Sequence, residues 1–134
     1  MRGCVRLDDI AVVIVDDDDA IRFSLAEYLT GRGATVFACS DAREGLEAVR
    51  DHRPNIVLSD IGLPNRNGFE LLEDIRSLDA EQGGRVPVIA MTALGGNIGR
   101  GRTNGDAFQA LLRKPFRPDQ LLAALVSNLD RDEK

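Results

Sequence analysis

The stretch "VVIVDDDD", residues 12–19, decides the fold, because an apolar run that begins at Ile10 ends abruptly in four consecutive aspartates. A continuous apolar run of this length is typical of a strand that is covered on both faces, as in a parallel sheet. The aspartates that follow repel one another, since two like charges about 4 Å apart cost roughly 4 kcal/mol at an effective dielectric near 20. We therefore expect a cation close to the end of this strand.

Four more apolar runs follow, at residues 34–38, 56–58, 86–91 and 108–112. Between them lie apolar residues at helical spacing, and the last such stripe, 121–129, has Pro118 near its first turn. Strands that alternate with helices predict an α/β fold, here a doubly wound, three-layer α/β/α arrangement around a five-stranded parallel sheet.

The fourth helical position differs from the others, because the sequence "GGNIGRGRTNG", residues 95–105, holds five glycines. Each glycine costs a helix interior about 1 kcal/mol relative to alanine, so we expect a short, frayed or absent helix. A nucleotide-binding loop is not indicated, since Asn104 stands where a third glycine should be and no Gly-Lys-Ser/Thr follows.

Length, net charge, the first apolar run and the cysteine spacing limit the kinds of protein that this sequence can be. The 134 residues fit one domain, and the net charge of −5 disfavours nonspecific nucleic-acid binding, so we expect no direct nucleic-acid partner. The candidates for a local basic patch are Arg100, Arg102, Arg113, Lys114 and Arg117. The first apolar run is too short to span a membrane. Cys4 and Cys39 lack metal or redox spacing, which favours reduced thiols in a cytoplasmic protein.

The residues that follow the predicted strands suggest a site, because sites in such folds lie beyond the carboxyl ends of the strands. These residues are Asp16 and Asp17 after the first strand, Asp60 after the third, Thr92 after the fourth and Lys114 after the fifth. Three carboxylates without histidine or cysteine suit a hard cation, and we expect Mg²⁺. Carboxylates form aspartyl-phosphates, so Asp60 is the candidate nucleophile, and the cation, Lys114 and Thr92 would neutralise the phosphoryl oxygens.

These five positions, in this order and spacing, resemble the response-regulator receiver domains of two-component signalling (CheY-like). The resemblance implies a flavodoxin-like strand order of 2-1-3-4-5. It also implies a phosphoacceptor Asp60, a Mg²⁺ site formed by Asp16, Asp17, Asp60 and the backbone carbonyl of Gly62, and contacts from Thr92 and Lys114 to the phosphoryl group. The "DxxxPxxxG" turn is matched by Pro64 and Gly68, and Pro115 matches a Lys-Pro step that is usually cis in the family.

The resemblance sets the expected boundaries and partners. We expect an N-terminal extension at residues 1–8, a receiver domain at 9–129 and a polar tail at 130–134, in either a stand-alone protein or part of a larger one such as a hybrid kinase. The implied partners are a histidine kinase or histidine phosphotransfer protein and an unidentified downstream protein. No membrane partner is implied. The protein would catalyse only its own phosphorylation and dephosphorylation, as a signalling phosphoacceptor and not a metabolic enzyme.

Three positions depart from the family pattern. Leu111 stands where the family usually has the aromatic residue of its switch, and Phe108 is interpreted as strand core. Gly62 and Leu94 occupy positions that tune loss of the phosphoryl group, and neither offers a polar group to hold an attacking water. We therefore expect a long-lived phosphorylated form.

The remaining charged candidates have structural interpretations. Asp18 and Asp19 are expected to begin the first helix, with Asp19 as its N-cap, because a carboxylate there can bond free N–H groups. His52 is interpreted as an exposed residue near the end of the second helix.

Two other functions are consistent with the fold. The first is a receiver-like interaction module that is never phosphorylated. The second is a phosphatase of the haloacid-dehalogenase type, which needs an acid two residues after the nucleophile; Gly62 stands there, so the leaving group lacks an evident proton donor.

Overall fold

The computed structural model describes residues 6–93 and 108–129. Five parallel strands form one sheet in the order β2-β1-β3-β4-β5. Their bounds are β1 Ala11–Val15, β2 Thr35–Cys39, β3 Ile56–Asp60, β4 Val88–Thr92 and β5 Ala110–Arg113. The predicted strand order and the doubly wound α/β/α class are therefore confirmed.

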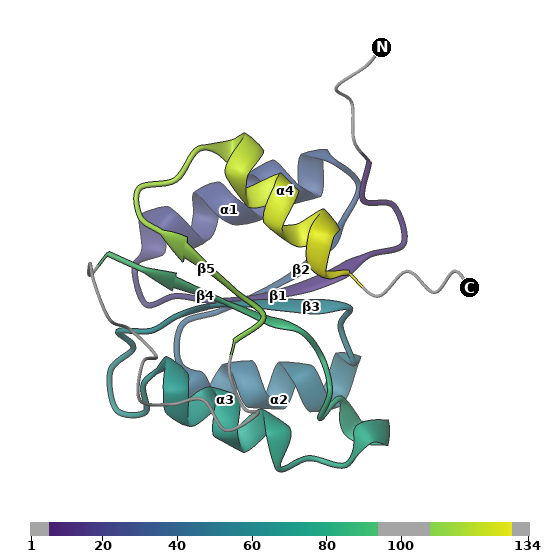
Figure 1. Cartoon of the computed structure of the whole chain (residues 1–134), viewed down its shortest axis with the longest axis vertical. Helices are drawn as coiled ribbons and strands as arrows, with labels where there is room; N and C mark the ends of the chain where they lie inside the picture. Colours follow the sequence, from purple (N-terminus) through teal and green to yellow (C-terminus); the bar gives the residue numbers. More distant parts are fainter. Residues whose placement is uncertain (1–5, 94–107, 130–134) are drawn as a thin grey trace.

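Helices cover both faces of the sheet (Figure 1). The helices α1 (Asp19–Gly31) and α4 (Pro118–Asn128) lie on one face, while α2 (Ala42–His52) and α3 (Gly68–Arg76) lie on the other. A short 3-10 turn, η1 (Ala80–Gln82), follows α3. Among the described residues, no helix is long and apolar enough to cross a membrane.

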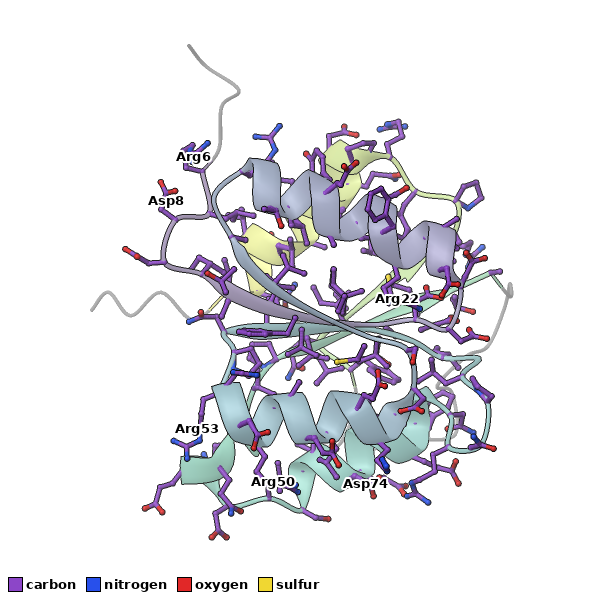
Figure 2. All side chains as sticks on the ribbon, turned by 180° about the vertical axis from the view of Figure 1, so that it is seen from behind. Arg6, Asp8, Arg22, Arg50, Arg53 and Asp74 are labelled. Atoms are coloured by element: carbon purple, nitrogen blue, oxygen red, sulfur yellow. The ribbon has the colours of Figure 1, made fainter. Side chains whose placement is uncertain are left out.

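The continuous apolar run in β1 is explained by this arrangement, because side chains of a strand point alternately to opposite faces. Val12 and Ile14 pack into the core beneath α1 and α4, whereas Val13 and Val15 pack into the core beneath α2 and α3. All four are fully buried. Side chains fill the space between the sheet and each helical layer (Figure 2).

Side-chain caps fix where the helices begin. Asp41 caps α2, and Asn67 forms a capping box with Glu70 at the start of α3. Pro118 occupies the first turn of α4, as predicted. The prediction that Asp19 caps α1 is wrong: Asp18 has extended backbone angles and its carboxylate accepts the N–H of Ile21, which is the N-cap geometry.

The structure also places several residues whose positions were predicted individually. Leu7, in the predicted N-terminal extension, is buried in the core, and its N–H donates to the Arg32 carbonyl at 2.7 Å. Phe108 precedes β5 and packs against Phe69 of α3, with ring centroids 5.4 Å apart. His52 is exposed and is the last residue of α2, as predicted, and it stacks on Phe37 with ring centroids 3.8 Å apart. The glycine-rich segment 95–105 and Leu94 lie outside the described residues.

Candidate functional site

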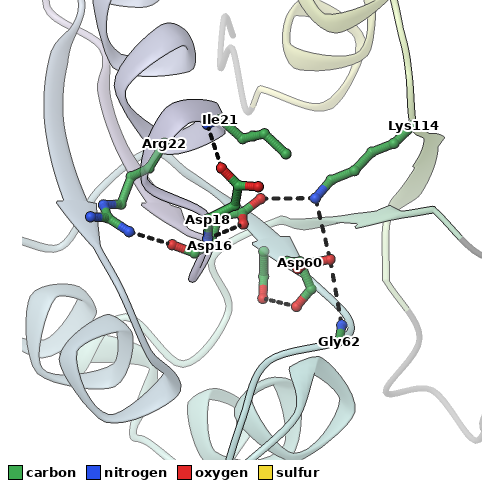
Figure 3. Close-up of polar contacts among 8 residues, drawn as sticks. Asp16, Asp18, Ile21, Arg22, Asp60, Gly62 and Lys114 are labelled. Carbon is green, nitrogen blue, oxygen red and sulfur yellow. Dashed lines mark hydrogen bonds and ion pairs between the residues drawn. The ribbon is translucent and has the colours of Figure 1, made fainter.

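The carboxyl ends of the strands bring the predicted residues to one edge of the sheet. Asp60 and Thr92 are the last residues of β3 and β4, which pair side by side, and Asp16 and Lys114 directly follow β1 and β5. Figure 3 shows the Lys114 amine between the carboxylates of Asp16 and Asp60. Its Nζ lies 2.9 Å from Asp16 Oδ2 and 3.5 Å from Asp60 Oδ1. Residues far apart in the sequence are therefore in direct contact.

Asp16 is fully buried, and hydrogen bonds hold it in place. Its Oδ1 accepts a hydrogen bond from the N–H of Asp18 at 2.9 Å, and its Oδ2 accepts one from the Lys114 amine. Its own N–H donates to the Cys39 carbonyl of the neighbouring strand at 3.1 Å. A buried carboxylate needs such donors, because an unpaired buried charge is strongly unfavourable.

The electrostatics of the site reflect burial and close charges. Burial raises the pKa of Asp60, with the negative charge of Asp16 acting in the same direction and Lys114 opposing both. Burial by itself would lower the pKa of Lys114, but the hydrogen bond and charge of Asp16, together with Asp60, outweigh it, so that pKa is raised. Lys114 is therefore a stable cation between two carboxylates.

The acidic cluster fits a divalent cation. Asp16, Asp17 and Asp60 each offer a carboxylate oxygen, and these three oxygens lie within 4.8 Å of one another. Oxygen-only ligands suit Mg²⁺, which binds through one or two carboxylates and keeps several waters. Both Asp16 oxygens already accept hydrogen bonds, whereas Asp17 is exposed and Asp60 is half-buried. Asp17 and Asp60 are thus the more available ligands.

The loop after β3 is tightly packed at one point and open at another. A Cβ at Gly68 would lie 2.6 Å from the Asp60 carbonyl oxygen, so only glycine allows α3 to start this close to the strand end. The Gly62 N–H points toward Asp60 Oδ1 at 3.4 Å. A Cβ at Gly62 would meet nothing within 4 Å, so this position has room for a larger side chain.

Thr92 and Leu111 belong to the region where the family switch is expected. Thr92 is 2% exposed, and its carbonyl accepts the Lys114 N–H at 2.6 Å. The Lys114–Pro115 peptide bond is cis, as the resemblance implied. Leu111, on β5, is 43% exposed, so the position of the usual aromatic residue carries an aliphatic side chain at the surface.

Arg22 is a neighbour of the site that the sequence interpretation missed. Its guanidinium donates from Nη1 to the Asp16 carbonyl at 2.8 Å (Figure 3). Its Nη2 donates to the Asp19 carboxylate. The available signal was the spacing of Asp19 and Arg22, because opposite charges three residues apart meet on a helix surface. That rule predicts the pair with Asp19 but not the bond to Asp16.

Comparisons with known proteins identify the family. The family model described as "Response regulator receiver domain" matches residues 12–126, so the chain belongs to that family. It is 32% identical over 122 residues to the DNA-binding response regulator MtrA of Mycolicibacterium smegmatis, with 91% of this chain and 51% of MtrA covered. The transcriptional regulatory protein AfsQ1 of Streptomyces coelicolor is 34% identical over 88 residues, covering 66% and 37% respectively.

Solved structures show the same fold. The chemotaxis protein CheY4 of Vibrio cholerae superposes with a TM-score of 0.81 at 28% identity, covering 90% of this chain and 98% of CheY4. The receiver domain of the sensor histidine kinase PA1611 of Pseudomonas aeruginosa gives 0.79 at 25% identity, covering 89% and 96%, and was solved with magnesium coordinated in its active-site cleft. The chain spans about half the length of the MtrA relatives it matches.

Proposed function

We propose that this chain is a phosphoacceptor whose Asp60 receives a phosphoryl group from a phospho-histidine in a Mg²⁺-dependent reaction. The observation that carries the proposal is the acidic cluster of Asp16, Asp17 and Asp60, with oxygens within 4.8 Å of one another, beside the Lys114 amine. Members of the receiver family act as signalling phosphoacceptors, which supports the same role here.

The proposed reaction exchanges one bond to phosphorus for another. An Asp60 carboxylate oxygen attacks phosphorus in line, the O–P bond forms, the N–P bond to the donor imidazole breaks, and the imidazole nitrogen takes a proton from solvent. Lys114, Thr92 and the N–H groups of the loops after β3 and β4 would hold the equatorial oxygens. Asp16, Asp17, Asp60 and the Gly62 carbonyl would hold the cation, which supplies charge neutralisation.

The partners follow from this chemistry. We propose a histidine kinase or histidine phosphotransfer protein as donor and a protein as target of the switched surface, in the cytoplasm. The MtrA relatives are named as DNA-binding response regulators, and this chain spans about half of their length. The function proposed for this chain therefore does not include DNA binding. The net charge of −5 also disfavours direct nucleic-acid binding.

The test is labelling by a small acyl phosphate with and without Mg²⁺. We expect one phosphoryl group per chain, complete dependence on Mg²⁺, and no labelling of Asp60→Ala. The matched control is Asp51→Ala, an exposed aspartate on α2 that should label like the unmodified protein. An unlabelled but folded wild-type chain would instead support the unphosphorylated interaction module.

A further inference from the structure

Arg22 holds the turn that connects β1 to α1. Its side chain is only 21% exposed, although its partner Asp19 is 88% exposed. One guanidinium nitrogen donates to the Asp16 main-chain carbonyl at 2.8 Å, and another donates to the Asp19 carboxylate. A single planar group therefore connects the first and last aspartates of the "DDDD" stretch.

This contact completes the fixation of Asp16. The carboxylate and N–H of Asp16 are bonded to Asp18, Lys114 and Cys39, and Arg22 supplies the donor to its carbonyl. Asp18 is fixed in turn, because its N–H bonds Asp16 and its carboxylate caps α1. Asp17 lies between two fixed residues, so the backbone on either side sets the direction of its Cα–Cβ bond.

The charge of Arg22 and its geometry predict opposite effects on a cation. The positive charge of the Arg22 guanidinium, beside the acidic cluster, repels Mg²⁺, so removal of Arg22 would tighten Mg²⁺ binding. The hydrogen bonds of Arg22 order the Asp16–Asp17 turn, which favours Mg²⁺ binding. By this effect, removal of Arg22 would weaken Mg²⁺ binding. The pair with Asp19 offsets much of the guanidinium charge, whereas the bond to the Asp16 carbonyl remains.

We propose that Arg22 is a positioning residue that fixes the Asp16 carbonyl and thereby presents Asp17 to the divalent cation. The inference rests on the proposed function, because it concerns the same cation site. It assigns Arg22 a role through the backbone, without contact to the metal or the phosphoryl group. Lysine cannot replace it, because two separate nitrogens of the guanidinium reach two acceptors, while lysine has one nitrogen.

The test is calorimetric titration of the full unphosphorylated chain with Mg²⁺. We expect Arg22→Lys and Arg22→Gln each to weaken binding by roughly tenfold, the lower end of the loss when a partner that orients a metal ligand is removed. The matched control is Arg43→Gln, whose 76% exposed side chain pairs with Glu47 at 4.0 Å and should bind Mg²⁺ like wild type. Wild-type affinity of Arg22→Lys, or tighter binding by Arg22→Gln, would overturn the inference.

A second readout separates positioning from loss of fold. Hydrogen exchange of the Asp18 amide, measured without Mg²⁺, should speed up in both Arg22 variants while amides in the centre of β3 keep their protection. Uniformly faster exchange would show general destabilisation and overturn the positioning role. If wild type itself fails to bind Mg²⁺, the proposed function fails as well, whereas equal binding by wild type and both Arg22 variants removes only this inference.

Discussion

At the amino ends of the strands, neutral side chains bond the backbone: Asn55 accepts the Ala11 N–H at 2.7 Å, and Gln109 accepts the Val88 N–H at 2.9 Å. At the carboxyl ends, Asp16 and Asp60 place like charges close together around one lysine. In Figure 2, Arg6 and Arg53 lie at the opposite end of the sheet from Arg22, which marks the two edges. The two edges of one sheet thus use polar groups differently.

One edge of the sheet therefore stabilises the fold, and the other edge carries the chemistry. The amino edge satisfies strand N–H groups that would otherwise be unpaired, which supports stability. The carboxyl edge holds carboxylate oxygens of Asp16 and Asp60 within 4.8 Å of each other. Burial and the charge of Asp16 raise the pKa of Asp60, and Lys114 only partly offsets them. Substitutions at the carboxyl edge should therefore change phosphorylation, and substitutions at the amino edge should change unfolding.

Among variants that keep the acceptor Asp60, the largest expected effect comes from Lys114. Lys114→Ala removes the amine that lies 3.5 Å from Asp60, and we expect the labelling rate by acyl phosphate to fall by roughly 100-fold, as when a preorganised donor is lost from a charged transition state. Arg117→Ala is the control, because that exposed side chain pairs with Asp119. Equal rates in the two variants would show that Lys114 does not serve the site.

The lifetime of the phosphorylated form should respond to Gly62. Gly62→Asn adds an amide that can hold an attacking water, and the open space at this position accommodates it, so we expect loss of the phosphoryl group to become several-fold faster. The readout is the decay of label after removal of the donor. Gly31→Asn, also at an open position but on α1, should leave the decay unchanged; an unchanged lifetime in Gly62→Asn would contradict the explanation.

The opposite edge should show the opposite behaviour. Asn55→Ala removes the acceptor of the Ala11 N–H, and we expect the free energy of unfolding to fall by about 1 kcal/mol with unchanged labelling. Asp60→Asn should not lower stability, because it removes a charge that burial and Asp16 disfavour. Chemical denaturation of both variants measures the free energies of unfolding. A fall in labelling of Asn55→Ala with unchanged stability would contradict the assignment of the two edges.

The smallest effects separate the two aspartates that begin α1. Asp18→Ala removes the helix N-cap and should cost about 1 kcal/mol of unfolding free energy. Asp19→Ala removes an exposed pair with Arg22 and should cost about 0.3 kcal/mol. Thermal or urea unfolding of the two variants provides the measurement. A larger loss of unfolding free energy in Asp19→Ala than in Asp18→Ala would show that Asp19 is the N-cap.

Sequence patterns predicted the sheet well because burial on both faces leaves an unmistakable apolar run, as in β1, and because strand ends carry the polar residues. The N-cap was placed one residue too late, since four identical aspartates offer no chemical distinction and the choice depends on backbone angles. Arg22 was missed because its bond to Asp16 goes to a main-chain carbonyl, which every residue has. Leu7 was assigned to an extension, although a tertiary contact with Arg32 draws it into the core.

The assignment of Asp60 as the phosphoacceptor is tested by mapping the phosphoryl group on the labelled chain, by reduction of the acyl phosphate and peptide mass spectrometry. Loss of labelling in Asp60→Ala cannot by itself exclude a neighbouring acceptor, because Ser59 precedes Asp60 and its hydroxyl lies 3.1 Å from the Asp60 carbonyl oxygen. We predict modification of Asp60, with Ser59, Asp16 and Asp17 unmodified. Stable modification of any of these other residues, with Asp60 untouched, would contradict the account.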